Sequence, residues 1–390
     1  MIAQPFFDTV KHREIPTGSL AFLPTERVVW GFSILDSLGD LLRDFGANRV
    51  VLLTTASLVA EKTLLVRVER ALDGLLMGRC ASLAAHVPAE GVAQARRLYQ
   101  KTRADTLVTL GGGSVIDAGK AVAGELLDAG WPKPVHVTVP TTLSGAELSH
   151  YFGVTTTKDA VSVKRSFARE DCTPGVVVYD PAATLATPSR LWTSSGIKAL
   201  DHAIEGLLSR PPNPVVDSLA LLGIRRLATA IEKSLDVDAL GERLEAQLAA
   251  WQCFFAPGSV PLGLSHRIGH ILGGTFGVAH GLTSCATLAP VMRMMAPAAP
   301  ARLAAIDAAL DLDQLFDLTA PQSGDALRAA DRVEALVRSL GLPSRLGALG
   351  VEREQLPTLG RILRETYPEA MRQLAGGSDD PLKELLHDMW

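Results

Sequence analysis

The sequence contains few cysteines, and their wide spacing argues against metal sites or disulfide networks built from several cysteines. Only four occur among 390 residues, and Cys80, Cys172, Cys253 and Cys285 lie far apart along the chain. This spacing argues against a zinc knuckle and against a disulfide-bonded scaffold. A chain that depends on neither fits a reducing compartment, so we expect it in the cytoplasm.

Long apolar runs and basic tracts are also missing. No stretch of about 18 apolar residues is free of charges and helix breakers, so we expect no membrane span. The first residues, Met-Ile-Ala-Gln-Pro-Phe-Phe-Asp, lack the basic, apolar and small-residue order of a secretion signal. The formal net charge of -4 gives no reason to expect a nucleic-acid partner.

The hydrophobic content of 47% is ample for large buried cores, and a chain of this length usually forms two or more domains. In the first half, short β-rich runs alternate with helical stretches. We interpret residues 49–55, 106–110 and 135–139 as buried strands and residues 176–179 as the last strand. Strands that alternate with helices predict a parallel, wound sheet.

The pattern changes beyond about residue 188. Long Ala- and Leu-rich segments such as 215–233 and 240–255 have helical spacing and almost no strand character. The sequence therefore predicts an α/β plus all-α architecture. We place an α/β domain in residues 1–188 and an all-helical domain in residues 189–390.

A glycine-rich loop follows the strand predicted at 106–110 and opens a predicted helix. Gly111, Gly112 and Gly113 let backbone amides approach a phosphate, and the helix N-terminus adds a partial positive charge. Ser114 would cap the helix or donate to the phosphate. The spacing is neither that of G-x-G-x-x-G nor that of a Walker loop. A purely structural turn is the alternative, but the strand-loop-helix setting favours phosphate binding.

A second polar loop follows the next predicted strand. Its hydroxyl groups, from Thr141, Thr142 and Ser144, would line the same edge of the sheet, where the carboxyl ends of wound strands place ligands. A plain polar turn is the alternative here.

Histidines are concentrated in two short motifs. The chain has nine histidines, and His266, His270 and His280 fall within 15 residues, with His202 upstream. Imidazole suits metal ligation and proton transfer near neutral pH. His266 and His270 are four apart and share a helix face. We expect Gly273-Gly274 to end or bend that helix, which returns His280 to the same site. The alternative is unrelated surface and core histidines.

Together these motifs resemble those of a known family. The chain resembles the iron-containing (group III) alcohol dehydrogenases, and within them the maleylacetate reductase branch. The resemblance covers nearly the whole chain, and the matching motifs are at residues 111–120, 140–147, 202–205, 213–214 and 266–280. It implies a Rossmann-like, dehydroquinate synthase-like N-terminal nucleotide-binding domain, a helical C-terminal domain, an active site in the cleft between them, and a homodimer.

The resemblance also implies a bound nicotinamide dinucleotide, NADH or NADPH. The residues implied to hold it are Gly111, Gly112, Gly113, Ser114, Asp117, Thr141, Thr142, Ser144 and Lys164. NAD-specific relatives have an Asp after the second strand, where this chain has Thr54-Thr55. Because an acid there would repel a 2′-phosphate, its absence permits NADP without requiring it.

The metal site of the family is incomplete in this chain. In metal-dependent members one Asp and three His hold the metal, and the histidines correspond to His202, His266 and His280, with His270 as a nearby catalytic residue. The Asp position is Lys198 here. An ammonium is no ligand for a divalent cation and repels one. Asp201 is a poor substitute, because neighbouring helix residues point about 100° apart. The resemblance implies a metal-free maleylacetate reductase branch, which usually carries Asn at this position, so we expect no metal.

We therefore predict a reductase of a small carboxylated ketone or enone. Hydride would come from the nicotinamide, and Lys198 with His202, His266 and His280 would stabilise charge on the substrate oxygen in place of a metal. His270 is the predicted proton donor. Arg267 is the predicted partner of a substrate carboxylate. The alternatives are a solvated Arg267 and a Lys198 that extends its ammonium to solvent and has no role.

Other functions stay open at this stage. The nearest is a conventional iron- or zinc-dependent alcohol dehydrogenase or aldehyde reductase. A lysine beside histidines could instead form a Schiff base with a carbonyl substrate. A binding protein that keeps the fold without turnover is the third alternative.

Overall fold

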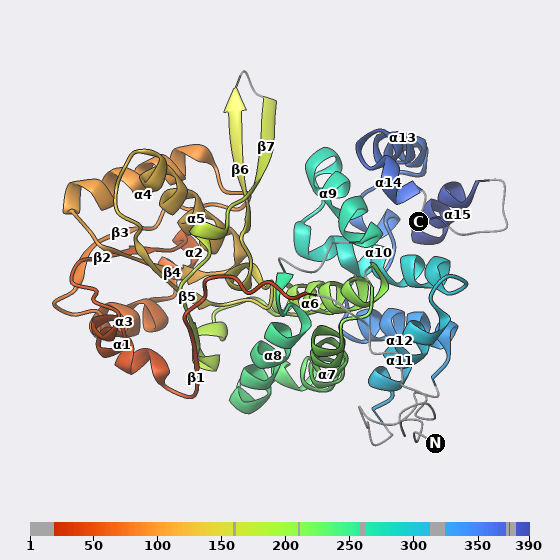
Figure 1. Ribbon diagram of the computed structural model, residues 1–390, viewed down its shortest axis with the longest axis horizontal. Coiled ribbons are helices and arrows are strands. Elements are labelled where there is room, and N and C mark those ends of the chain that lie inside the picture. Colours follow the sequence, from red (N-terminus) through yellow and green to blue (C-terminus); the bar gives the residue numbers. More distant parts are fainter. Residues whose placement is uncertain are drawn as a thin grey trace, which may run out of the picture.

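The computed structural model describes residues 19–158, 161–209, 211–257, 263–312, 324–371, 374 and 380–390. An α/β part and a helical part lie side by side (Figure 1). No helix within these ranges is both long enough and apolar enough to cross a membrane.

The α/β part is built on a six-stranded parallel sheet with the order β1-β8-β5-β4-β2-β3. Its strands are β1 (Arg27–Trp30), β2 (Val50–Leu53), β3 (Leu76–Cys80), β4 (Thr106–Gly111), β5 (Val135–Pro140) and β8 (Val176–Tyr179). The predicted parallel sheet is confirmed, and all four predicted strands are present. The sequence reading missed β1 and β3. They form the two edges of the sheet and are only partly buried, so neither reads as a continuous buried apolar run.

Helices cover both faces of this sheet, and alternate strand residues supply the two cores. Val50 and Leu52 pack with α1 (Leu38–Asp44) and α3 (Lys62–Ala71). Val51 and Leu53 pack on the other face with α4 (Ala89–Thr102) and α5 (Gly113–Asp128). Burial on both faces explains why the central strands are apolar at nearly every position. A short helix, α2 (Ala56–Ala60), follows β2.

A separate hairpin leaves the sheet between β5 and β8. Strands β6 (Tyr151–Lys158) and β7 (Val161–Ala168) pair antiparallel and project from the α/β part beside α9 (Figure 1). Phe152 and Phe167 stack across it with ring centroids 5.2 Å apart. The sequence reading did not predict this hairpin, because its strands carry many polar and charged residues and largely avoid burial.

The helical part begins at α6, and the described residues after β8 contain no strand. Its helices are α6 (Ser189–Ser209), α7 (Pro214–Ala230), α8 (Leu240–Cys253), α9 (Leu264–Phe276), α10 (His280–Met295), α11 (Pro300–Leu310), α12 (Ala326–Ser339), α13 (Leu356–Thr366), α14 (Pro368–Met371) and α15 (Pro381–Met389). The α/β and helical fold is therefore as predicted. The division into domains at residue 188 stays a prediction.

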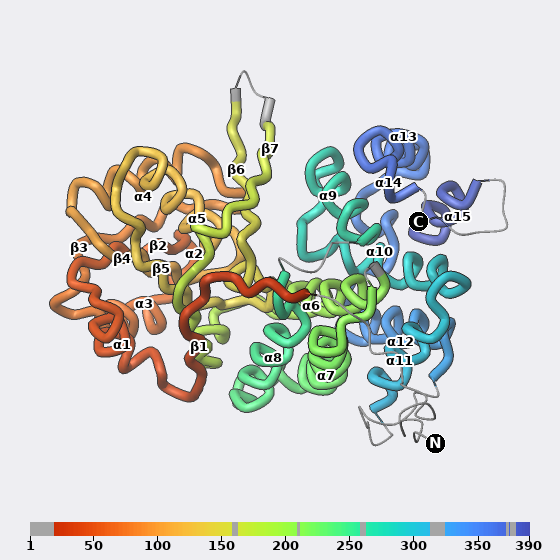
Figure 2. Tube along the Cα trace, in the orientation of Figure 1, coloured from red at the N-terminus to blue at the C-terminus, as the bar shows by residue number. Residues whose placement is uncertain are grey.

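Helix α6 occupies the centre of the helical part. Its apolar residues Trp192, Ile197 and Ile204 are fully buried in one core with residues of α7, α8, α10 and α12. The segment before β1 runs along this part of the molecule (Figure 2), where Phe22 packs edge-on against Phe255 with ring centroids 6.3 Å apart. A helix enclosed in this way can hold charged side chains only if they are paired.

Candidate active site

The glycine loop and the second polar loop lie directly against each other. β4 ends at Gly111, and Gly112 is the cap of α5. A Cβ added to Gly112 would lie 2.9 Å from Thr142 Cγ2, and one added to Gly113 would lie 3.0 Å from Ser144 Oγ. The two loops therefore meet at one edge of the sheet, as predicted from their positions after neighbouring strands. The glycines are required by this close packing, whether or not a phosphate binds.

Asp117 and Lys120 form an ion pair one turn into α5. Lys120 Nζ lies 3.3 Å from Asp117 Oδ1 and donates to the Tyr151 carbonyl over 2.8 Å. Burial raises the pKa of Asp117, and the positive charges of Lys120 and Lys164 oppose that rise. Lys120 is fully buried. Asp117 thus holds a lysine beside the loop, a contact that the sequence reading did not predict.

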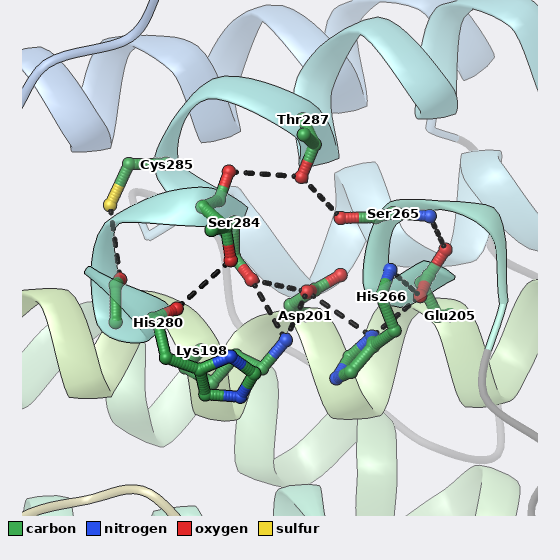
Figure 3. Close-up of polar contacts among 11 residues, drawn as sticks. Lys198, Asp201, Glu205, Ser265, His266, His280, Ser284, Cys285 and Thr287 are labelled. Atoms are coloured by element: carbon green, nitrogen blue, oxygen red, sulfur yellow. Dashed lines mark hydrogen bonds and ion pairs between the residues drawn. The ribbon is translucent and has the colours of Figure 1, made fainter. Parts of the chain in front are cut away.

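Three buried polar groups meet between α6 and α10 (Figure 3). Lys198 Nζ lies 3.3 Å from Asp201 Oδ2 and 3.2 Å from Ser284 Oγ, and the Ser284 hydroxyl donates to the same Asp201 oxygen. Burial alone would raise the pKa of Asp201, but His266 and Lys198 outweigh it and lower that pKa. The cluster is an internal ion pair with a hydroxyl bridge.

His266 is held by two carboxylates from α6. Its Nδ1 lies 2.6 Å from Glu205 Oε2 and 3.2 Å from Asp201 Oδ2. Glu205 also accepts from the backbone N–H groups of Ser265 and His266, at 2.6 and 3.0 Å. These amides belong to the first turn of α9, whose N-cap Gly263 has no side chain to satisfy them. The Glu205 carboxylate therefore does two things: it caps α9, and it orients the His266 ring.

The other histidines surround this cluster. His202 stacks on His266 with ring centroids 4.8 Å apart and on Phe254 at 3.9 Å. Burial, His266 and Lys198 hold the pKa of His202 well below its usual value. Within the described part of the chain, His202 Nδ1 and His266 Nε2 have no hydrogen-bond partner. Two buried nitrogens are thus left unpaired on one side of the cluster.

His270 and His280 form a more open pair. Their ring centroids are 6.0 Å apart, and solvent reaches both side chains. The surrounding protein and the charges of Lys198 and Lys164 lower the pKa of both. The structure therefore brings the four predicted histidines and Lys198 into one neighbourhood. Helix α9 ends at Gly277, whose φ is +69°, not at Gly273-Gly274 as expected.

Arg267 does not join this site. Its guanidinium lies 2.9 Å from Glu369 Oε1 and 5.5 Å from the ring centre of Tyr367. Neighbouring helix positions point in different directions, so a residue beside His266 faces the C-terminal helices instead. In this structure Arg267 pairs with Glu369, and its pairing with a substrate carboxylate stays a prediction.

The sequence reading also misjudged the acidic residues. Asp201 is expected to be a poor substitute for the missing Asp ligand, yet it contacts Lys198, Ser284 and His266 and lies in the one group of possible metal ligands among the described residues. Glu205 and Ser284 were not singled out at all. A helical-wheel signal was available for both acids, because Asp201 lies three residues after Lys198 and Glu205 three after His202.

One group of side chains in the described ranges could hold a metal ion. Atoms of Asp201, Glu205 and His266 lie within 4.8 Å of one another. The expected set of His202, His266 and His280 does not form such a group among the residues described. The histidine nitrogen already contacts both carboxylates, Asp201 is paired with Lys198, and Glu205 accepts from two backbone amides.

Comparison with known proteins agrees with this architecture. The family model of iron-containing alcohol dehydrogenases matches residues 24–181, and the model of the C-terminal part of that family matches residues 192–369. Maleylacetate reductase from Pseudomonas sp. (strain P51) is 33% identical over 302 residues, which is 75% of this chain and 81% of that protein. The Burkholderia cepacia maleylacetate reductase is 32% identical over 88% of this chain and 90% of that protein.

A solved structure gives the same result. The crystal structure of maleylacetate reductase from Agrobacterium tumefaciens superposes with a TM-score of 0.80 at 27% identity, over 96% of this chain and 99% of that chain. Both family models together span most of the 390 residues, and the shared fold extends over nearly all of them. The chain therefore belongs to the iron-containing alcohol dehydrogenase family and is an oxidoreductase.

Proposed function

We propose that this protein is an NAD(P)H-dependent reductase of a small carboxylated ketone or enone, similar to the maleylacetate reductases, and that it works without a metal. The observation that carries the proposal is the Lys198 ammonium, which is buried beside His202 and His266 and held by Asp201 and Ser284. A fixed positive charge stands at the family's metal-ligand position.

The group of Asp201, Glu205 and His266, as it is bonded here, does not suit a zinc ion. Zinc needs ligand atoms about 2.0–2.2 Å from the ion and a deprotonated histidine nitrogen. Here His266 Nδ1 is hydrogen-bonded to Glu205, and both oxygens of Glu205 accept backbone N–H groups. The Lys198 ammonium lies 3.3 Å from Asp201 Oδ2 and would repel a cation there. We therefore derive no step through a metal.

The cofactor residues follow from the two loops. Gly111, Gly112, Gly113 and Ser114 present the N-terminus of α5, which suits a pyrophosphate. Thr141, Thr142 and Ser144 supply hydroxyls beside it. A nicotinamide bound there would donate a hydride to the substrate carbon. The residues of the loop bind and orient that cofactor and take no part in the chemistry.

The helical part supplies charge stabilisation and a proton. Negative charge would build on the substrate oxygen during hydride transfer, and the proposed groups that stabilise it are Lys198 and the imidazoles of His202, His266 and His280. His270 is the proposed route for the proton, because solvent reaches its ring beside His280. Asp201 and Ser284 hold the ammonium in position. The exposed Lys164 is a second cation proposed for an anionic group.

Partners and location follow the same proposal. A carboxylated substrate suits the two ammonium groups, Lys198 and Lys164, whose charges both act on His270 and His280. We also propose a homodimer and a cytoplasmic location, without a nucleic-acid or membrane partner. All four cysteines are free and buried, as a reducing compartment permits.

A metal-dependent alcohol dehydrogenase is the second candidate. It is favoured by the proximity of Asp201, Glu205 and His266, which are the right residue types for a divalent cation. It requires Lys198 to lose its proton or to move. A Schiff-base mechanism is disfavoured, because an ammonium paired with Asp201 has no free electron pair for attack on a carbonyl.

The decisive experiment measures turnover and metal together. Protein purified without chelator is assayed for NADH and NADPH oxidation with maleylacetate and with short aldehydes, and its iron and zinc are measured in the same samples. We expect turnover with the carboxylated substrate, far less than one metal per chain, and no loss of activity in EDTA. About one metal per chain with EDTA-sensitive aldehyde reduction would establish the second candidate instead. Borohydride trapping with substrate tests the Schiff base.

A further inference from the structure

Gly153 on β6 makes room for the side chain of Lys164 on β7. In the antiparallel register Gly153 pairs with Ser166, which makes Lys164 its diagonal neighbour. Diagonal neighbours lie within reach of long side chains. A Cβ added to Gly153 would lie 2.4 Å from Lys164 Cε and 3.3 Å from Lys164 Nζ. The lysine therefore crosses the backbone of Gly153, where any other residue would displace it.

The charge of Lys164 acts on groups in both functional regions. Its charge opposes the rise that burial causes in the pKa of Asp117, beside the glycine loop. The same charge adds to the effects of surrounding protein and of Lys198 that lower the pKa of His270 and His280. A single ammonium thus acts on the phosphate-loop side and on the histidine side. Its side chain is exposed to solvent.

The base of the hairpin is fastened to α5 at the same place. Lys120 donates to the Tyr151 carbonyl over 2.8 Å, and Tyr151 begins β6, two residues before Gly153. The strand that carries Gly153 is therefore held against the helix of the glycine loop. Because the strand itself is held in place, the path of the Lys164 side chain over Gly153 determines where its ammonium points.

We propose that Gly153 is a positioning residue that directs the Lys164 ammonium to an anionic group of the bound dinucleotide, between the glycine loop and the histidines. The inference rests on the proposed function for the identity of that ligand. Glycine at this strand position leaves free the space that the end of the lysine side chain occupies. Gly153 itself touches no ligand.

A double-mutant cycle tests the proposal by cofactor binding. The variants are Gly153→Ala, Lys164→Ala and the double variant, with NADH and NADPH binding measured by fluorescence titration. An added methyl displaces only the flexible end of a lysine, so Gly153→Ala should fold normally. We expect each single variant to weaken binding of the dinucleotide about tenfold, the scale of one charged hydrogen bond. In the double variant Lys164 Cε is absent, so Gly153→Ala should add no further loss.

The control is Ser166→Ala, which alters the cross-strand partner of Gly153 and should bind cofactor like the wild type. Equal losses that add fully in the double variant would overturn the proposal, because Gly153 would then act independently of Lys164. Unchanged binding in Lys164→Ala would overturn it as well. If the wild type binds NAD(P)H but reduces no carbonyl, the proposed function is contradicted. The double-mutant cycle still tests the role of Gly153, because it measures binding and not turnover.

Discussion

Lys198 and Asp201, one turn apart on α6, form a buried ion pair in which Lys198 Nζ lies 3.3 Å from Asp201 Oδ2. Neither side chain has meaningful contact with solvent. Two buried charges are tolerated together because each offsets the desolvation of the other, and removing one leaves the other uncompensated. We expect stability and catalysis to depend on this pair in different ways.

The first prediction separates those two dependences. Lys198→Met and Asp201→Asn should each lower the free energy of unfolding by about 3–5 kcal/mol, and the double variant should recover most of that loss. The kcat for hydride transfer should fall about 10²–10³-fold in Lys198→Met and stay low in the double variant. Urea unfolding and steady-state kinetics measure the two effects. Lys233→Met, at an exposed lysine, is the control. Near wild-type kcat in the stable double variant would show that Lys198 has only a structural role.

The second prediction concerns metal affinity. Lys198→Asp places a carboxylate four residues before His202, as in metal-dependent relatives, and removes the repelling ammonium. We expect the variant to gain zinc or iron toward one ion per chain, while the wild type carries no stoichiometric metal. Elemental analysis and the rise in thermal midpoint with added zinc are the measurements. Equal metal content in the two proteins contradicts the prediction.

The third prediction tests the glycine loop. Gly112→Ala should weaken NAD(P)H binding by about tenfold or more, because a Cβ obstructs close approach of a phosphate to the backbone. That Cβ would also lie 2.9 Å from Thr142 Cγ2, so Gly112→Ala/Thr142→Ser is the matched variant that removes the methyl. Binding should stay weak in it. Full recovery would mean that the glycine serves loop packing alone. Gly241→Ala, with open space around its Cβ, is the control.

The fourth prediction concerns the choice between NADH and NADPH. Thr55 caps α2 by accepting from the Leu58 N–H over 3.3 Å, and Asp is an equally good cap. Thr55→Asp should weaken NADPH binding about five- to tenfold relative to NADH, because its charge repels a 2′-phosphate. Thr55→Asn keeps the cap without the charge and should leave the ratio unchanged. If the ratio of NADPH affinity to NADH affinity is the same in both variants, the adenosine ribose does not bind beside Thr55.

The fifth prediction is a pH dependence of stability. Burial raises the pKa of Glu147 from 4.5 to about 7, although Tyr179 donates a hydrogen bond to it over 3.0 Å. The folded protein therefore holds this proton more tightly than the unfolded chain. Its contribution to stability is present below about pH 4.5 and is lost as pH rises through about 7. Relative to Glu147→Gln, the wild type should lose about 2–3 kcal/mol between pH 5 and pH 8.

Urea unfolding of both proteins at the two pH values gives that difference. Glu232→Gln, at an exposed position, is the control and should track the wild type. A stability difference between wild type and Glu147→Gln that does not change with pH would show that Glu147 ionises normally in the folded protein.

The sequence by itself determined the four inner strands of the parallel sheet, the change to helices after them, and the two loops that follow β4 and β5. Strands β2, β4, β5 and β8 are buried on both faces, so local composition reveals them. The glycine loop and the histidine motifs could be read because each lies within one short segment. Their family resemblance then implied that they belong to one site.

Only the tertiary structure decided which charges pair. Arg267 meets Glu369, which is far away in sequence, and Asp201 contacts His266 of α9 and Ser284 of α10 besides Lys198 on its own helix. The hairpin that brings Lys164 close to the histidines was also not read from its sequence. A buried charge takes the partner that three-dimensional packing brings within about 4 Å, and the spacing of residues along the chain specifies no such distance across helices.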